Sequence, residues 1–466
     1  MFLKKYIGDR AFYRRVVAIA VPIMIQNGIT NLVNLLDNVM VGSLGTEPMS
    51  GVSIVNQFIF IFNLLVFGII SAAGIFTAQY KGKEDEDGIR YTLRFKFFAT
   101  LLAGVLGIVG FIFFGDELIS MFLHTSESQG DLVLTLNEGK KYLYIMLIGL
   151  MPYGIAQVYA STMRETGQTV VPMVASLVAV GVNFVFNFIL IFGHLGFPAL
   201  GVEGAAIATV LSRFCELGVL LVWGYTHKNK CGYLRGALRS FKVPRRLFLS
   251  IMAKGLPLMS NEVLWAIAMV LRNQCFSTRG LDVVAALNIN STIVNLFQVA
   301  YMAIGSSIAI IVGNELGAGK FEEAKDTDRK LMAFCVAMSV AMAGIIIAFS
   351  GVFPLLYKTE AHVRDLASYT MLISAVFMPF ASFAYSSYFT LRSGGKVFIT
   401  LLFDSGYMWG LVIPITAALS YFTNMGIHEI FAISMSTELI KAGFGYLLLR
   451  RGTWVRQIVD DDSLKG

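Results

Sequence analysis

The stretch VPIMIQNGITNLVNLLDNVMVGSLG, residues 21–45, guides the interpretation of the whole chain. It is long and apolar enough for a membrane-spanning helix, which needs about 20 mostly apolar residues. It nevertheless contains one acid, Asp37. An ionised carboxylate inside a lipid-spanning helix costs several kcal/mol, so intramembrane acids are rare and usually line a cavity or an ion path. Asp37 is therefore the first candidate functional residue.

The chain repeats this stretch later as LPLMSNEVLWAIAMVLRNQCFSTRG, residues 256–280. One proline and one glycine coincide in the two copies while a charge differs: Pro22 falls on Pro257, Gly45 on Gly280 and Asp37 on Arg272. Two more pairs of segments repeat at a similar spacing, 78–90 with 313–325 and 151–168 with 378–395. The sequence therefore predicts an internal duplication in which each half holds the same helices.

Composition indicates a membrane protein. The chain is 56% hydrophobic and 14% charged, whereas a soluble domain carries roughly 25% charged residues. We expect an all-α integral membrane protein with 12 transmembrane helices in two six-helix bundles. The stretches that are long and apolar enough to span a bilayer are 15–42, 51–79, 91–114, 139–162, 169–193, 201–226, 247–278, 284–315, 329–350, 365–391, 397–420 and 426–449.

Lys and Arg alternate between successive connections. The N-terminal arm, the tail and connections 80–96, 227–254, 317–330 and 392–396 are basic, whereas 43–50, 194–200 and 421–427 contain no Lys or Arg. Cytoplasmic loops carry such an excess, so we expect both termini in the cytoplasm and a multi-pass protein of a bacterial plasma membrane. The net charge of +7 is then explained by topology and membrane lipid, with no nucleic acid as partner.

Six helices in each half would make both halves enter the membrane from the same face. The two bundles are then related by a pseudo-two-fold axis along the membrane normal. The predicted organisation is an amino-terminal lobe at 1–226, a cytoplasmic linker at 227–246, a carboxy-terminal lobe at 247–450 and a cytoplasmic tail at 451–466.

Several motifs resemble the multidrug and toxin extrusion (MATE) family. The most specific run is residues 164–213, which contains Gly-x-Thr before Pro172 and the pair Asn183 and Asn187. The motifs LLDNVMVGSLG at 35–45, CFSTRG at 275–280 and RSGG at 392–395 are similar to the same family. The resemblance covers about 15–450. It implies cation-coupled export of organic, often cationic, drugs by proton or sodium antiport.

For the first half, the resemblance implies an ion site formed by Asp37, Asn183, Asn187 and Thr209. Many members have Asp where this chain has Asn187, so the site keeps one carboxylate among neutral oxygen donors. Such donors suit a hard cation, here Na⁺ at Asp37, Asn183 and Asn187, and equally suit a lone acid that takes up a proton. We expect no cofactor and no tightly bound metal; the coupling ion is H⁺ or Na⁺.

In the second half, Glu262, Arg272 and Asp404 are the polar or substrate-binding candidates. Glu262 matches an acid of another branch of the family, whose tenth-helix acid has no counterpart at 378–391. Glu262 and Arg272 stand about 15 Å apart along one helix and cannot touch, so Asp404 is the expected partner of Arg272. A structural ion pair and a charge-balanced site for a cationic drug both remain open.

Two pairs of opposite charges are spaced i, i+3 within the sixth and twelfth predicted helices. They are Arg213 with Glu216 and Glu438 with Lys441. Residues at this spacing are neighbours on a helix surface, so we expect each pair to form within its own helix, or the side chains to snorkel toward the inner face of the membrane.

The sequence contains no catalytic motif. His428-Glu429 lacks the second His of an HExxH zinc site, and four scattered cysteines give no metal or disulfide pattern. We expect a secondary active efflux transporter and not an enzyme: a monomer that antiports organic, drug-like cations against H⁺ or Na⁺ by alternating access. One alternative is a lipid-linked oligosaccharide flippase of the same superfamily, which would need more deep bases than Arg272. The other is a non-transporting membrane sensor.

Overall fold

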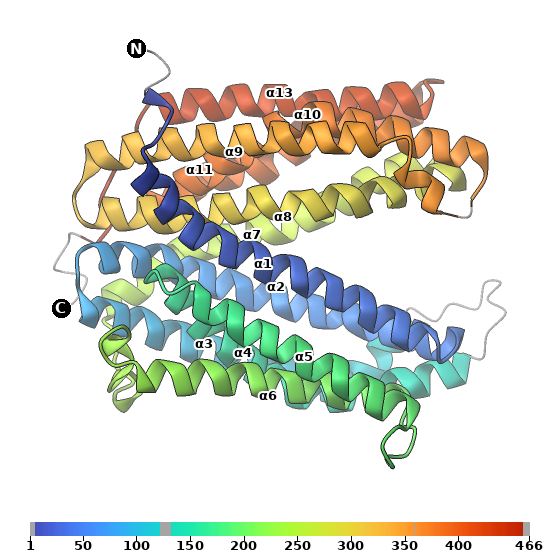
Figure 1. Ribbon diagram of the computed structural model, residues 1–466, viewed down its shortest axis with the longest axis horizontal. Helices are drawn as coiled ribbons and strands as arrows, with labels where there is room; N and C mark the ends of the chain where they lie inside the picture. The colour runs from blue at the N-terminus through green and yellow to red at the C-terminus, as the bar shows by residue number, and fades with distance from the viewer. Residues whose placement is uncertain (1–4, 122–131, 358, 460–466) are drawn as a thin grey trace. The chain divides into compact units, whose positions relative to one another are not determined.

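The computed structural model describes residues 5–121, 132–357 and 359–459, and the regular elements of these residues are all helical (Figure 1). Residues 460–466 of the predicted tail lie outside this range. Eleven described helical segments are long and apolar enough to cross a membrane, which confirms an all-helical, multi-pass membrane protein. The long helices are α1 (Arg10–Gly42), α2 (Thr46–Gly82), α3 (Glu86–Met121), α4 (Leu132–Glu165), α5 (Val170–Phe192), α6 (Val202–Thr226), α7 (Arg245–Ser277), α8 (Leu281–Gly317), α9 (Phe321–Phe349), α10 (Ala361–Ser393) and α13 (Ile427–Arg450).

The predicted stretch at 397–420 is helical but not uniform. It consists of α11 (Val397–Leu401), two π-helical segments, η5 (Leu402–Gly406) and η6 (Met408–Val412), and α12 (Ile413–Phe422). The segment Val397–Phe422 counts as one of the eleven segments that are apolar enough to cross a membrane. The predicted stretch at 426–449 forms α13 but is not one of those eleven. The arrangement of twelve helices in two bundles therefore stays a prediction.

The internal duplication is visible in the backbone. Gly45 and Gly280, which align in the sequence, precede α2 and α8 with φ of 124° and 120°. Residues with a side chain are strained at such angles, so both turns require glycine. Aligned prolines also lie inside corresponding helices: Pro22 in α1 and Pro257 in α7, Pro152 in α4 and Pro379 in α10.

Contacts divide the chain into two compact units. The carboxy-terminal unit gathers the chain up to Met24, Ala78–Asp85 and the chain from Leu249 onward, whereas the amino-terminal unit consists mainly of Ile25–Thr77 and Glu86–Phe248. The chain therefore passes between units within α1, near the end of α2 and within α7. The predicted lobe boundaries at 226 and 247 stay a prediction.

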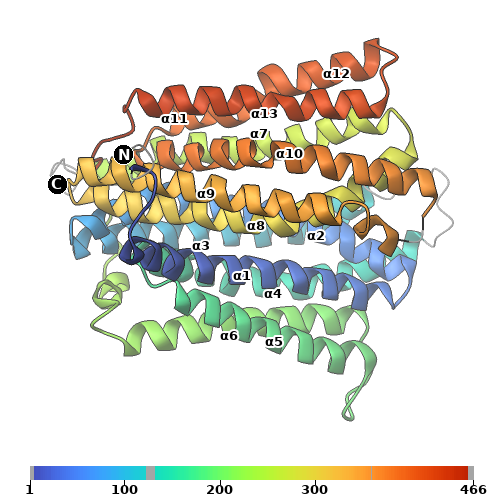
Figure 2. The same ribbon diagram turned by 45° about the horizontal axis from the view of Figure 1, so that its top comes forward.

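In the amino-terminal unit, α6 packs against both α4 and α5 (Figures 1 and 2). Gly204 permits the close approach of α6 to α5, because a Cβ at this position would lie 2.6 Å from the carbonyl group of Leu190. Gly51 of α2 and Gly139 of α4 meet in the same way, since a Cβ at Gly51 would lie 2.6 Å from the carbonyl oxygen of Thr135. These small residues let polar groups of neighbouring helices come within hydrogen-bond distance.

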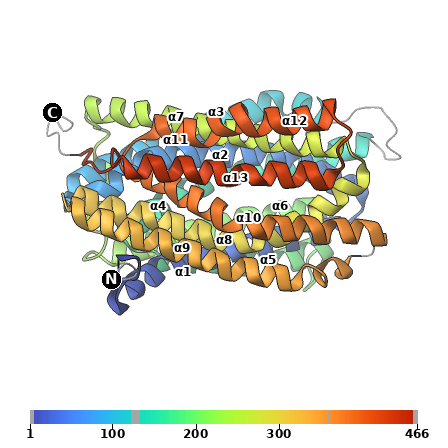
Figure 3. The same ribbon diagram turned by 90° about the horizontal axis from the view of Figure 1, so that it is seen from above.

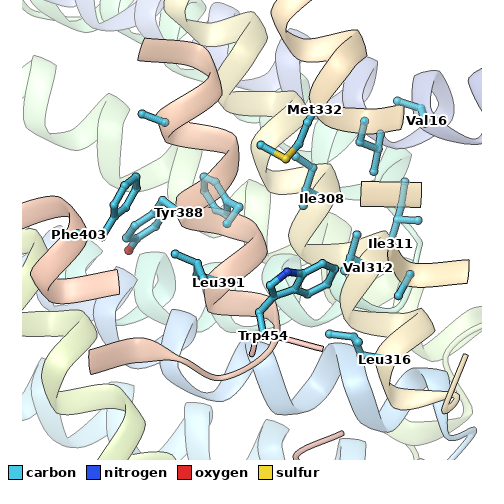
Figure 4. Packing of buried hydrophobic residues seen from close by; sticks show 14 residues of the cluster. Val16, Ile308, Ile311, Val312, Leu316, Met332, Tyr388, Leu391, Phe403 and Trp454 are labelled. Carbon is cyan, nitrogen blue, oxygen red and sulfur yellow. The ribbon is translucent and has the colours of Figure 1, made fainter. Parts of the chain in front are cut away.

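In the carboxy-terminal unit, α10 packs against α8, α9 and α13, and α9 lies beside α8 (Figure 3). Figure 4 shows the buried cluster at one end of this packing. Ile308, Val312 and Leu316 of α8 meet Leu391 of α10 and Trp454, which follows α13 and is 3% exposed. The indole of Trp454 therefore belongs to the core of this unit.

The end of α2 crosses the end of α8 at two aligned glycines, Gly82 and Gly317. A Cβ at Gly82 would overlap the carbonyl oxygen of Asn314, and one at Gly317 would overlap that of Gln79. The segment after α13 forms hydrogen bonds to both helices at this crossing. Gln457 Nε2 donates to the carbonyl of Gly317 over 2.7 Å. The side chain of Gln79 accepts a hydrogen bond from the backbone N–H of Ile458 over 2.7 Å.

Candidate cation and substrate sites

The carboxylate of Asp37 on α1 meets α5 at Asn187. The Asn187 side chain donates from Nδ2 to Asp37 Oδ1 over 2.5 Å. Asn187 is 1% exposed and Asp37 is half-buried. A short hydrogen bond to an ionised acceptor is among the stronger kinds, so α5 holds the carboxylate of α1 in a defined position.

The remaining residues expected at the first ion site continue this contact. Asn187 Nδ2 also donates to Asn183 Oδ1 over 3.2 Å, and Asn183 Nδ2 donates to Thr209 Oγ1 on α6 over 3.2 Å. The structure therefore brings Asp37, Asn183, Asn187 and Thr209 into one hydrogen-bonded chain over three helices. The i, i+4 spacing on α5 sets the two amides on one face.

One oxygen of this chain is unsatisfied. Asn187 Oδ1 is buried and accepts no hydrogen bond from any described residue. A buried acceptor without a donor is costly, and this one belongs to the side chain that contacts the only acid of the set. Carboxylate, amide and hydroxyl oxygens are the ligands that hard cations prefer, so the donor set fits a cation or a proton carried on Asp37.

Arg213 on α6 is the charged neighbour of this site. Its positive charge acts on Asp37, its guanidinium lies over the ring of Tyr153 at 4.5 Å, and its Nη1 is 3.9 Å from Glu216 Oε2. The predicted pairing of Arg213 with Glu216 within α6 is thus confirmed. Arg213 therefore acts electrostatically on two carboxylates, Glu216 of its own helix and Asp37 of α1.

Glu216 is the end of a second buried network that the sequence did not reveal. Glu216 is 4% exposed and accepts from Ser176 Oγ on α5 over 2.9 Å. Ser176 in turn accepts from Gln26 Nε2 on α1 over 2.8 Å, and Gln26 Oε1 accepts from Arg164 on α4 over 3.1 Å. Four helices therefore contribute to a polar interior next to the Asp37 chain.

A faint signal for this network exists in the spacing. Ser176 and Asn183 are seven residues apart on α5, and Thr209 and Glu216 are seven apart on α6. Seven residues are about two helical turns, so each helix presents one polar stripe that serves both networks. The sequence alone could not show that Gln26 and Arg164 face these stripes.

In the second half, Glu262 and Arg272 on α7 are not brought together. Glu262 Oε1 accepts from the Tyr388 hydroxyl on α10 over 3.3 Å. The opposite charge that acts on Arg272 belongs to Glu438 on α13. The expectation that Asp404 is the partner of Arg272 is wrong.

Asp404 is bound from α13 and α7. Lys441 Nζ donates to its Oδ1 over 2.7 Å, and Asn261 Nδ2 donates to its Oδ2 over 3.0 Å. Lys441 thus forms its ion pair with Asp404 and not the predicted one with Glu438, which acts on Lys441 only electrostatically. The reason is local: Asp404 lies in η5, and π-helical turns insert extra residues and change which side a helix presents. The neighbouring Ser405 fixes this turn by donating from Oγ to the carbonyl of Asn261 over 2.8 Å.

No group of three or more His, Cys, Asp or Glu side chains suited to a metal occurs among the described residues. The four cysteines are free. Of the second-half candidates, Asp404 is bound by Lys441 and Asn261, while Arg272 is acted on electrostatically by Glu438.

Known proteins resemble the chain over most of its length. The MatE family model matches residues 22–189 and again 257–417, so its two matches begin at the aligned prolines. Relatives include the probable multidrug resistance protein YoeA of Bacillus subtilis, 24% identical over 412 residues and 87% of both chains. The probable multidrug resistance protein NorM of Thermotoga maritima is 21% identical over 448 residues, which are 96% of this chain and 94% of that one. A solved outward-facing multidrug resistance MATE family transporter of the MOP superfamily superposes with a TM-score of 0.85, at 21% identity, over 97% of both chains.

Proposed function

We infer the function of this chain from its family, because it belongs to the multidrug and toxin extrusion (MATE) family of efflux transporters: the MatE model matches more than half of its residues. Such proteins are transporters and not enzymes, as the sequence predicts. The finer proposal is a secondary active transporter that exports organic, drug-like cations in exchange for H⁺ or Na⁺ by alternating access.

The observation that carries this proposal is the contact of Asp37 with Asn187 beside an unsatisfied oxygen. One oxygen of the carboxylate accepts from Asn187 over 2.5 Å, while the carbonyl oxygen of the same amide has no donor among the described residues. A cation that binds Asp37 would compete with the Asn187 amide for the carboxylate. A rotated amide would then offer its free oxygen to that cation.

This exchange supplies two states that a coupling ion can distinguish. A ligand shifts a conformational equilibrium only through its different affinities for the two states, and coupling between two ligands is reciprocal. In the proposed cycle, the cation favours the state in which the cation binds Asp37. The substrate favours the state in which Asn187 is hydrogen-bonded to Asp37. Each ligand therefore promotes release of the other.

The proposed setting is a plasma membrane crossed twelve times, with both termini in the cytoplasm and two six-helix bundles related by a pseudo-two-fold axis. The aligned glycines at 45 and 280 and the aligned prolines within helices support the duplication. The alternation of basic connections supports the orientation.

The test is efflux of tetraphenylphosphonium from proteoliposomes that contain the purified chain. A proton gradient and a sodium gradient are imposed separately, so that the driving ion is identified. We expect one gradient to drive efflux and Asp37→Asn to abolish it with normal purification and unfolding behaviour. The matched control is Glu322→Gln, which neutralises a carboxylate that is 85% exposed on α9. Gradient-driven efflux that survives Asp37→Asn at the control rate would refute the proposal.

A further inference from the structure

The connection from α6 into the start of α7, residues 227–246, contains the excess positive charge of the chain. The whole chain has 37 Lys and Arg against 30 Asp and Glu, and this connection has seven of the bases and none of the acids. The remainder therefore holds equal numbers of bases and acids. All seven bases are exposed, and we call them the basic linker surface: Lys228, Lys230, Arg235, Arg239, Lys242, Arg245 and Arg246.

Other basic connections neutralise their charges locally. On α9, Lys325 pairs with Glu322 over 2.6 Å, and on α3, Arg90 pairs with Glu86 over 2.9 Å. No ion pair within 4.0 Å joins the basic linker surface to a described residue. Glu86 approaches the connection at Gly232 but is the partner of Arg90. Membrane topology requires Lys and Arg on the cytoplasmic side and is little affected by accompanying acids, so topology does not explain why acids are missing here.

The backbone that carries these bases is folded onto the amino-terminal unit. Arg94 of α3 donates from Nε to the carbonyl of Ala237 and from Nη1 to the carbonyl of Lys242, the second over 2.9 Å. Tyr233 is 3% exposed, and its hydroxyl is hydrogen-bonded to that of Thr166, just after α4, over 3.1 Å. A surface that is already ordered loses less conformational entropy on binding than a flexible linker does.

Two exposed aromatic rings accompany the bases. Phe241 is 77% exposed, and its ring centroid lies 4.9 Å from that of Phe98 on α3. Phe248 is 45% exposed and lies 5.5 Å from Phe95 of the same helix. Because α3 is apolar enough to cross the membrane, rings beside it are favourable at the level of the headgroups, where aromatic side chains of membrane proteins gather. The neighbouring bases then lie at the depth of the lipid phosphates.

We propose that the basic linker surface binds the headgroups of anionic phospholipids, with Phe241 inserted at the boundary between headgroups and acyl chains. Lys and Arg bind phosphate through charge-assisted hydrogen bonds. Clusters of about four to eight such bases beside a spanning helix attract an anionic leaflet. Nucleic acid also offers phosphates, but the exposed rings beside a spanning helix favour lipid. The inference goes beyond the proposed efflux function and uses only the position of residues 227–246 at the membrane surface.

The test measures lipid binding to the full-length chain in a non-ionic detergent by microscale thermophoresis. The probes are dioctanoyl-phosphatidylglycerol, which is anionic, dioctanoyl-phosphatidylcholine, which is zwitterionic, and inorganic phosphate. We expect phosphatidylglycerol to bind about tenfold more tightly than phosphatidylcholine, and phosphate not to compete with it. Added salt should weaken phosphatidylglycerol and leave phosphatidylcholine unchanged, because salt screens exposed charges.

Four bases of the surface are neutralised together in one variant, while its three lysines remain. The substitutions are Arg235→Gln, Arg239→Gln, Arg245→Gln and Arg246→Gln. This variant should lose the preference for phosphatidylglycerol, and the same four positions changed to Lys should keep it. The matched control neutralises four cytoplasmic bases from the connection that has its own acids. These substitutions are Lys320→Gln, Lys325→Gln, Arg329→Gln and Lys330→Gln, and the preference should remain.

Phe241→Ser provides a second, uncharged test. It should weaken both lipids by the same factor and leave their ratio unchanged, because the ring contacts the acyl boundary and the bases contact the phosphate. If the four-Gln variant does not fold, Phe241→Ser and the four-Lys variant carry the test. Unchanged affinity of Phe241→Ser for both lipids would contradict the insertion of the ring.

Four results would overturn the lipid surface. They are equal binding of the two lipids by the unaltered chain, an equal loss of preference in the control, displacement of phosphatidylglycerol by inorganic phosphate, and tighter binding of a short RNA than of phosphatidylglycerol. Efflux of tetraphenylphosphonium is measured separately. Lipid preference without gradient-driven efflux would leave this surface standing and remove the proposed function, and the reverse result would do the opposite.

Discussion

Asn187 donates both hydrogens of its side-chain amide, one to Asp37 over 2.5 Å and one to Asn183 over 3.2 Å. Its oxygen receives none from the described residues. The amide is therefore oriented by its donors alone, and its acceptor is held ready beside the carboxylate. This single side chain links the acid of α1 to the polar stripe of α5.

The hydrogen bond between Asn187 and Asp37 predicts that the carboxylate can be exchanged with the amide across this contact. In the double variant Asp37→Asn with Asn187→Asp, a carboxylate and an amide still face each other, with their places exchanged. We expect Asp37→Asn alone to lose gradient-driven efflux and the double variant to regain a measurable fraction of it. Proteoliposome efflux under the effective gradient measures both. A double variant as inactive as the single one would show that the carboxylate must stand on α1.

Arg213 predicts opposite effects from two neutralising substitutions. In Glu216→Gln the guanidinium loses the carboxylate 3.9 Å away, so its charge is free to compete with the coupling cation for Asp37. We expect the ion concentration for half-maximal efflux to rise about tenfold, which is about 1.4 kcal/mol. Arg213→Gln removes the guanidinium that competes with the coupling cation, so the ion concentration for half-maximal efflux should fall. If both variants shift the ion concentration for half-maximal efflux in the same direction, Arg213 does not act on the coupling site.

The crossing of α2 and α8 predicts a local stability cost. Gly317→Ala would place a methyl group against the backbone of Gln79, and overpacking of this kind costs about 1–3 kcal/mol. The matched control is Gly344→Ala on α9, where a Cβ would meet nothing within 4 Å and alanine favours the helix. Thermal unfolding in detergent should show a lower midpoint for the first variant only. Equal midpoints would contradict the close crossing.

The ion pair of Asp404 with Lys441 predicts coupled stabilities. Their side chains are 17% and 12% exposed, so removal of one partner leaves a mostly buried charge. We expect Lys441→Met and Asp404→Asn each to cost about 2 kcal/mol, after allowance for the partial exposure. The double variant should lose less than the sum. Additive losses in unfolding measurements would show that the pair contributes nothing as a pair.

The sequence predicted the parts of this molecule that depend on residue type and helical spacing. Asn183 and Asn187 were expected beside Asp37 because the resemblance to the MATE family implied that site, and their i, i+4 spacing placed the two amides on one helix face. The aligned pairs Pro22 with Pro257 and Gly45 with Gly280 likewise recur at the same places in the backbone.

The errors arose where pairing depends on how helices face one another. Asp404 was expected at Arg272 because Glu262 lies too far along the same helix to pair with that base. In the structure Asp404 lies in the π-helical segment η5, and its carboxylate binds Lys441 of α13. Gln26 joins Glu216 through Ser176 from a different helix, and no spacing along α1 reveals which neighbour it faces.

Two segments from the first part of the chain belong to the carboxy-terminal unit, which restricts where the gene could be split into two. A cut inside the linker at 227–246 would leave the chain up to Met24 and Ala78–Asp85 on the first fragment, although both pack with the second unit. Neither polypeptide would then carry a complete interior of its own. Separately translated halves should be recovered only when produced together, and each expressed by itself should be degraded or aggregate.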